Sequence, residues 1–254
     1  MVDSIKPALL RKAILLPTVF LFLLGCFCQQ IQAQDNATLV FENYKLAASG
    51  IQNLSYTVTR VDTFLSGDRR SITGQCIIRR EPDNALTGCS FSGKRNDLPV
   101  SHWYDGKDFY TINDDEKSYS VNHSPGKSIL GSVGGQMLCT EFYQPETDYT
   151  KLSLTIQPDY YVLRMDLPDL KKYDLTNRYK LLYLDKNSYL LQKIESFQGS
   201  PDKQQKSVVS FTDVFVNDPI TALNLNKSDV IRVYKLVEMP ESKEEPKRKK
   251  SKSK

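Results

Sequence analysis

The sequence predicts an α+β fold that is mainly β, with one antiparallel sheet preceded by a helix. Three observations predict it. Residues 35–49 repeat apolar side chains at helical spacing. From residue 54 onward, apolar and polar residues alternate, as they do in strands with one apolar face. Turn-forming pairs such as Asp105-Gly106 separate the alternating segments at short intervals, which is typical of an antiparallel meander.

The N-terminal residues have the layout of a secretory signal. Basic residues precede an apolar run, Ala13–Cys28, and a small residue, Ala33, follows the polar end of the segment. The run is shorter than the roughly 20 residues of a membrane-spanning helix. We therefore expect residues 1–33 to be a signal peptide that is cleaved after Ala33, which places the rest of the chain in the periplasm or cell envelope.

Two other interpretations of this segment remain open. Leu23-Leu24-Gly25-Cys26 resembles the lipobox of bacterial lipoproteins, which would leave Cys26 lipidated and anchor the protein to a membrane. Leu24 is bulky for the position two before the cysteine, which favours cleavage after Ala33. An uncleaved N-terminal anchor is the third interpretation. All three export the remaining chain.

The elements that follow are a helix and a series of strands. The helix is expected over Asp35–Ser49, because Asp35 and Asn36 can cap its N-terminus and Gly50 can end it. Strands are predicted at LSYTVTRV (54–61), SITGQCIIRR (71–80), SHWY (101–104), KDFYTI (107–112), KSYSV (117–121), KLSLTI (151–156), YYVLRMDL (160–167), NRYKLLYLD (177–185), YLLQKIESFQ (189–198), KSVVSFTDVFV (206–216) and VIRVYKLV (230–237).

The segment Ser124–Tyr143 interrupts the strand pattern. It combines four glycines with apolar residues, among them Met137. Small residues let backbone segments pack closely or move. We expect this segment to form a helical or loop cover over the sheet; an ordinary packed connection is the alternative.

Three cysteines follow the signal. Cys76 and Cys89 are equidistant from the centre of a turn-prone cluster, Glu81–Asn84, so in a hairpin they could face each other. An exported chain meets oxidising conditions, and a disulfide closing this loop would stabilise the fold by about 3 kcal/mol. The alternative is that these two cysteines and Cys139 are buried thiols.

The positive charge of the chain belongs to its ends. The net charge is +4 in total, of which residues 1–34 carry +2 and residues 241–254 carry +4, which leaves −2 for residues 35–240. A body of this charge is not expected to bind nucleic acid. Residues 239–254 are predicted to be a disordered basic tail. Its Lys247–Lys254 part could contact anionic membrane, or it could be a solvated tail.

Few residues offer catalytic chemistry. The chain has two histidines, His102 and His123, and lacks the H-E-x-x-H, G-x-S-x-G, P-loop and dinucleotide-binding motifs. A nucleophilic Cys139 paired with a histidine is formally possible, but no local feature indicates it. We therefore predict a protein that is not an enzyme and has no metal and no cofactor.

Aromatic residues are concentrated on the predicted strands. A sheet with one apolar face must be covered, and one helix and one glycine-rich segment form a thin cover. This favours an apolar cleft, although side chains of the chain itself could fill the space. Strand alternation gives the candidate cleft lining as Val58, Trp103, Phe109, Leu163, Leu182 and Phe211.

Several motifs occur in the order found in a known family. Gly74 begins a strand that ends in Arg79-Arg80 near Pro82, and Asp105-Gly106-Lys107 precedes two aromatic residues. Over residues 36–236 the chain resembles the periplasmic outer-membrane lipoprotein-carrier family (LolA/LolB-like). This resemblance implies an antiparallel half-barrel over residues 35–238, whose concave face is closed by a lid and binds acyl chains of lipids or lipoproteins.

The chain also departs from the family pattern. Glu81 separates the arginine from the proline, and Leu86 stands where the family has an aromatic residue. By position, Arg80, Leu86 and Met137 are the expected rim and lid residues. We expect a monomeric, non-enzymatic envelope protein that binds an acyl chain, a lipoprotein or another apolar ligand. The alternative is an envelope scaffold with a filled core that docks a protein partner or an anionic membrane surface.

Overall fold

The computed structural model describes residues 36–170, 176–200, 203–219 and 225–238. The expected signal peptide with Cys26 and Ala33, and the expected basic tail, therefore lie outside the described residues. The predicted helix is confirmed over residues 36–49. The strands are β1 (Asn53–Thr63), β2 (Arg69–Arg80), β3 (Cys89–Arg95), β4 (Val100–Tyr104), β5 (Phe109–Asn113), β6 (Ser118–Asn122), β7 (Lys151–Ile156), β8 (Tyr160–Asp166), β9 (Tyr179–Asp185), β10 (Leu191–Ser200), β11 (Lys203–Val216) and β12 (Lys235–Leu236).

The strands form one twelve-stranded sheet in the order β12-β6-β5-β4-β3-β2-β1-β11-β10-β9-β8-β7. The pairs from β2 to β6 and those from β7 to β11 are antiparallel, whereas β12 adds to β6 in parallel. The order has two ends, so the sheet is not closed. This confirms the predicted α+β, mainly β fold, with the unclosed sheet and N-terminal helix that a half-barrel requires.

The described chain divides into two compact units. Unit 1 contains the N-terminal helix, Tyr56–Thr73 and Cys139–Val214. Unit 2 contains Asn53–Ser55, Gly74–Leu138 and the residues from Phe215 onward. The expectation of one domain over residues 35–238 stays a prediction. No helix within the described ranges is long and apolar enough to cross a membrane.

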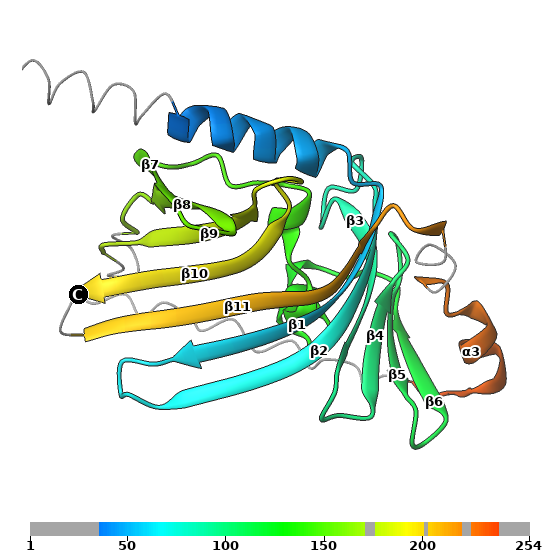
Figure 1. Cartoon of the computed structure of the whole chain (residues 1–254). Helices are drawn as coiled ribbons and strands as arrows, with labels where there is room; N and C mark the ends of the chain where they lie inside the picture. The colour runs from blue at the N-terminus through cyan, green and yellow to red at the C-terminus, as the bar shows by residue number, and fades with distance from the viewer. Residues whose placement is uncertain (1–35, 171–175, 201–202, 220–224, 239–254) are drawn as a thin grey trace, which may run out of the picture. The chain divides into compact units, whose positions relative to one another are not determined.

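In unit 1 the N-terminal helix packs through one face. Its buried residues recur at helical spacing and are Ala37, Val40, Phe41, Tyr44 and Ala48. The Phe41 ring meets the edge of Tyr149, just before β7, at 5.5 Å between centroids, so the helix (blue in Figure 1) lies beside β7. The Tyr44 hydroxyl donates to the carbonyl oxygen of Glu141 at 2.5 Å. These contacts hold the helix and the segment after residue 138 together.

The expected cover over Ser124–Tyr143 forms three short 3-10 helices: η1 (Lys127–Gly131) and η2 (Gly135–Met137) in unit 2, and η3 (Thr140–Phe142) in unit 1. In unit 1, Phe142 stacks on Tyr56 at 5.1 Å and meets Phe211 at 4.7 Å. In unit 2, a Cβ at Gly93 would overlap the carbonyl of Gly134. Glycine is needed here because two backbone segments are in contact.

The other face of the unit 2 sheet is covered by the C-terminal segment. Leu225, Val230, Ile231 and Tyr234 pack on the cluster that contains Trp103 and Ile112. The strand predicted over 230–237 is wrong for most of its length, because Ser228–Val233 forms the helix α3 and only β12 is extended. The helix places Val230, Ile231 and Tyr234 on the same cluster. The pattern of apolar residues in this segment did not distinguish a helix from a strand.

The hairpin of β2 and β3 is confirmed, but the expected cysteine pairing is wrong. Its register places Arg80 opposite Cys89 and Cys76 opposite Gly93. Cys76 therefore lies four residues along the strand from the position facing Cys89, about 13 Å away, whereas disulfides need Cα atoms within about 7 Å. Both side chains are buried thiols and no disulfide joins them. The turn spans residues 81–88, so its centre lies two residues beyond the one that the sequence suggested.

Candidate ligand-binding site

The six residues predicted to line a cleft are all buried. Val58, Leu163, Leu182 and Phe211 belong to unit 1, and Trp103 and Phe109 belong to unit 2. Phe211 packs against Tyr56 and Phe142, and Phe109 stacks on His102 at 5.1 Å. None of the four unit 1 residues lines the unit 1 cavity described below. Their role as ligand contacts stays a prediction.

Unit 1 contains a cavity of about 330 Å³ on one face of its strands. Its walls come from β1, β9, β10 and β11, from the loop after β8 and from Glu141 in η3. The lining residues are Arg60, Asp62, Glu141, Leu167, Arg178, Lys180, Ile194, Ser196, Phe197, Gln198, Gln205, Ser207 and Val209.

Strand register explains why the cavity changes character along its length. Directly opposite residues of paired strands lie on one face. The row Leu163–Leu182–Ile194–Val209 is apolar throughout. The next row on the same face, Met165–Lys180–Ser196–Ser207, becomes polar from β9 onward. The third row pairs Gln198 with Gln205, whose side chains are hydrogen-bonded at 2.8 Å. The cavity therefore has an apolar end and a polar end.

Two ion pairs stand in the wall of the cavity. The Arg60 guanidinium donates from Nε to both carboxylate oxygens of Asp62, at 2.9 and 3.0 Å, and Asp62 is buried. Residues two apart on β1 share a face, which is why the pair forms. The Lys180 ammonium pairs with the Glu141 carboxylate, which joins β9 to η3.

Arg178 is the third cation of the cavity. Its Nη1 donates to the carbonyl oxygen of Pro168 at 2.6 Å, and its own carbonyl accepts from the N–H of Leu167 at 2.8 Å. Arg178 and Leu167 also border a second cavity of about 600 Å³ in unit 1, together with Asp169 and Asn177. The sequence did not predict the unit 1 cavity. Alternation of apolar and polar residues within a segment does not show how that segment pairs with other strands.

Burial shifts the pKa values of two side chains considered for catalysis, His102 and Cys139. His102 Nδ1 accepts the N–H of Gly134 at 3.0 Å, and burial lowers the pKa of His102 to about 4. Burial and the Glu141 carboxylate raise the pKa of Cys139 to about 12, so its thiolate is scarce at neutral pH. Among the described residues there is no cluster of three or more side chains that could hold a metal ion.

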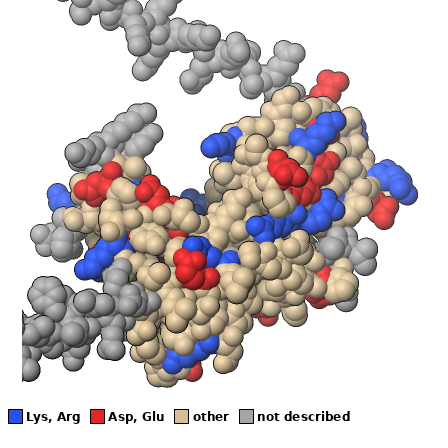
Figure 2. Space-filling model, turned by 90° about the horizontal axis from the view of Figure 1, so that it is seen from above, with Lys and Arg blue, Asp and Glu red and all other residues tan. Residues whose placement is uncertain are grey.

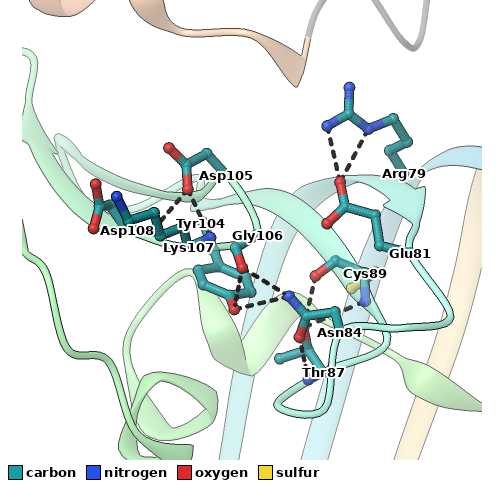
Figure 3. A network of polar contacts seen from close by, with 10 residues as sticks. All are labelled: Arg79, Glu81, Asn84, Thr87, Cys89, Tyr104, Asp105, Gly106, Lys107 and Asp108. Carbon is teal, nitrogen blue, oxygen red and sulfur yellow. Dashed lines mark hydrogen bonds and ion pairs between the residues drawn. The ribbon is translucent and has the colours of Figure 1, made fainter.

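The expected rim residues lie in unit 2, and one of them, Leu86, belongs to the turn at residues 81–88. The Asn84 amide donates to the Tyr104 hydroxyl and the Gly106 carbonyl, both at 2.9 Å, and its oxygen accepts the N–H groups of Leu86 and Thr87 at 3.1 Å. Figure 3 shows Asn84 at the centre of this network. Asn84 thus ties the turn to the neighbouring hairpin of β4 and β5.

The other two rim candidates differ in setting. Met137 is buried against Gly74, and Arg80 is half-buried at the end of β2. The Arg79 guanidinium, next to Arg80, pairs with the Glu81 carboxylate at 2.8 Å. Whether these residues govern a lid stays a prediction.

Charged side chains of both signs are mixed on the face of the described residues that Figure 2 shows. Figure 2 shows lysine and arginine interspersed with aspartate and glutamate on the face in view, without an extended region of one sign. A nucleic-acid-binding face would show a continuous basic region.

Comparisons with known proteins give similarity to solved structures. No protein-family model and no curated protein sequence matches the chain. A LolA superfamily protein from Nitrosomonas europaea is 12% identical with a TM-score of 0.35, and the match covers 72% of this chain and 94% of that one.

Two further solved structures are similar. A DUF1329 family protein from Desulfovibrio piger is 10% identical with a TM-score of 0.36, covering 75% of this chain and 98% of that one. A structure of the MucA/MucB complex from Pseudomonas aeruginosa is 15% identical with a TM-score of 0.38, covering 77% of this chain and 62% of that one. Similarity at this level carries no information on a ligand.

Proposed function

We propose that this protein is an exported, non-enzymatic binding protein of the cell envelope, and that it holds an amphiphilic ligand with an acyl chain or a comparable apolar part in the unit 1 cavity. The observation that supports the proposal is the change from apolar to polar side chains along one face of the sheet, from Ile194 and Val209 to Gln198 and Gln205. Export itself rests on the sequence of residues 1–33.

The apolar end offers a driving force for binding. Burying a methylene group contributes about 0.8 kcal/mol, and Ile194 and Val209 provide apolar surface for it. The polar end offers hydrogen-bonding groups. A bound hydrocarbon would bury these groups without giving them partners, and unpartnered buried polar groups reduce the binding free energy. An amphiphile therefore fits both ends better than a purely apolar ligand does. The volume lies in the range of about 300–1,000 Å³ typical of small-molecule sites.

The experiment is a binding measurement with a cavity-filling variant. Ser207→Phe adds a large side chain to the cavity wall, so we expect it to abolish binding of a fluorescent fatty acid that the unmodified protein binds. Val208→Phe is the matched control, because Val208 lies on the same strand with its side chain on the opposite face. Circular dichroism verifies that both variants fold.

Two results would contradict the proposal. One is that the unmodified protein binds no fatty acid and carries none in native mass spectrometry after mild purification. The other is that folded Ser207→Phe binds as tightly as the Val208→Phe control, which would place the ligand elsewhere.

A further inference from the structure

The cations of the unit 1 cavity are not equally neutralised. Arg60 faces Asp62, and Lys180 faces Glu141. Within the described ranges no carboxylate lies within ion-pair distance of the Arg178 guanidinium. The three cations and two carboxylates of the lining give the cavity a net charge of +1.

Arg178 also has hydrogen-bonding capacity beyond its contact with Pro168. A guanidinium carries five N–H donors in a planar fork, and the bond to the Pro168 carbonyl uses one of them. Two carboxylates border the second cavity with Arg178, those of Asp166 and Asp169, and Asp166 pairs with Arg164 at 2.8 Å. Asp169 is exposed, and it accepts the N–H of Asn177 at 3.0 Å. An exposed carboxylate is screened by water and salt, so it neutralises Arg178 only weakly.

The position of Arg178 along the strand places it at the polar end of the cavity. It precedes β9 and lies four residues before Leu182, a member of the apolar row. Four residues of strand span about 13 Å. A guanidinium at one end and apolar side chains at the other match a molecule with a charged end and a hydrocarbon body.

We propose that Arg178 binds the anionic head group, a carboxylate or a phosphate, of a single-chain amphiphile whose hydrocarbon chain lies against Ile194 and Val209. This inference rests on the proposed function of the cavity and specifies its ligand. The guanidinium fork suits both head groups, because each presents two oxygen atoms that can accept parallel N–H bonds.

The experiment is isothermal titration calorimetry on the purified protein with three ligands of equal chain length: dodecanoate, dodecyl phosphate and neutral dodecanol, each below its aggregation threshold. The variants are Arg178→Gln, which removes the charge, and Arg178→Lys, which keeps it without the fork. Arg69→Gln is the control, since Arg69 is exposed in the same unit and its substitution makes the same charge change.

We expect Arg178→Gln to weaken binding of the two anionic ligands at least about tenfold, with dodecanol unchanged. Arg178→Lys should lose less than Arg178→Gln, and Arg69→Gln should lose nothing. The tighter of the two anionic ligands identifies the head group as carboxylate or phosphate. In the unmodified protein, both anions should bind more tightly than dodecanol and than dodecyltrimethylammonium, a test that needs no variant to fold.

Three results overturn the inference. Anionic ligands that bind Arg178→Gln and the unmodified protein equally would show that Arg178 does not contact the head group. An equal loss of dodecanol binding would show that Arg178 acts through its bond to Pro168 and the shape of the loop. An unmodified protein that prefers dodecyltrimethylammonium would contradict an anionic ligand. In each case the unmodified protein still binds at least one of the probes, so the proposed function stands. If none of the probes binds, the proposed function itself is wrong.

Discussion

The sharpest prediction concerns the buried imidazole of His102. It lies on β4 in unit 2, is 6% exposed, and accepts the N–H of Gly134 through Nδ1 at 3.0 Å. Protonation of Nδ1 would replace this acceptor with a second donor, so the contact between the sheet and the segment before η2 would be lost. The pKa of His102 is lowered by burial from 6.5 to about 4.

The size of the effect follows from the two pKa values. Between pH 6.5 and 4 the unfolded chain binds a proton at His102 and the folded chain does not, so the free energy of unfolding falls as the pH falls. At about 1.4 kcal/mol per pH unit, the loss across this window amounts to about 3 kcal/mol. It is absent above pH 6.5, and it stops growing below pH 4, where the folded chain is protonated as well.

Urea unfolding at a series of pH values from 7.5 to 4 measures this loss. The control is His102→Gln, whose side-chain oxygen can accept a hydrogen bond without titrating. Carboxylates titrate in both proteins, so the difference between the two pH profiles isolates His102. We expect the profiles to diverge below pH 6.5 by up to about 3 kcal/mol. Parallel profiles would refute the reasoning, because they would mean that His102 has similar pKa values in the folded and unfolded chains.

Two further predictions concern packing and hydrogen bonding in unit 2. Gly93→Ala should destabilise the protein by about 1–3 kcal/mol and lower its thermal midpoint, because the added Cβ would overlap the backbone of Gly134. Gly126→Ala is the control. It should change the thermal midpoint little, because no atom lies within 4 Å of its added Cβ. Equal midpoints would contradict the close backbone contact. Asn84→Ala should cost about 2 kcal/mol or more in urea unfolding, since several hydrogen bonds of about 1 kcal/mol each are lost, and the exposed Asn187→Ala should cost almost nothing. A neutral Asn84→Ala would mean that the turn at 81–88 is held by other contacts.

Local patterns predicted most of the strands, but they missed β3 and did not determine every packing contact. The segment 54–61 is recognisable because polar side chains alternate with buried ones at Tyr56 and Val58. The segment 230–237 has a comparable content of β-branched and aromatic residues, yet its first half, Val230–Val233, is helical. Its conformation is decided by where Trp103 and Ile112 lie. That information is tertiary, and alternation within one segment does not contain it.

Register is the second quantity that the sequence left undetermined. The expectation for Cys76 and Cys89 placed the centre of the turn two residues too early, because Glu81–Asn84 has turn-forming composition while the turn continues to Gly88. Because the register was unknown, the sequence did not predict the unit 1 cavity either. Lys180, Ser196 and Ser207 come from three separate strands, and only their pairing brings them into one row.

The unit 1 cavity is costly for stability, and this supports a role in binding. Ser196 and Ser207 lie opposite each other on neighbouring strands, where β-branched or aromatic side chains would fill the volume and pack well. Empty volume and partly buried ion pairs both reduce the stability that the same positions could provide with apolar residues. A chain that only needed a stable sheet would gain from larger side chains at these two serines. Small side chains beside two ion pairs and Arg178 instead keep a space whose chemistry suits a ligand with a charged head group and a hydrocarbon chain.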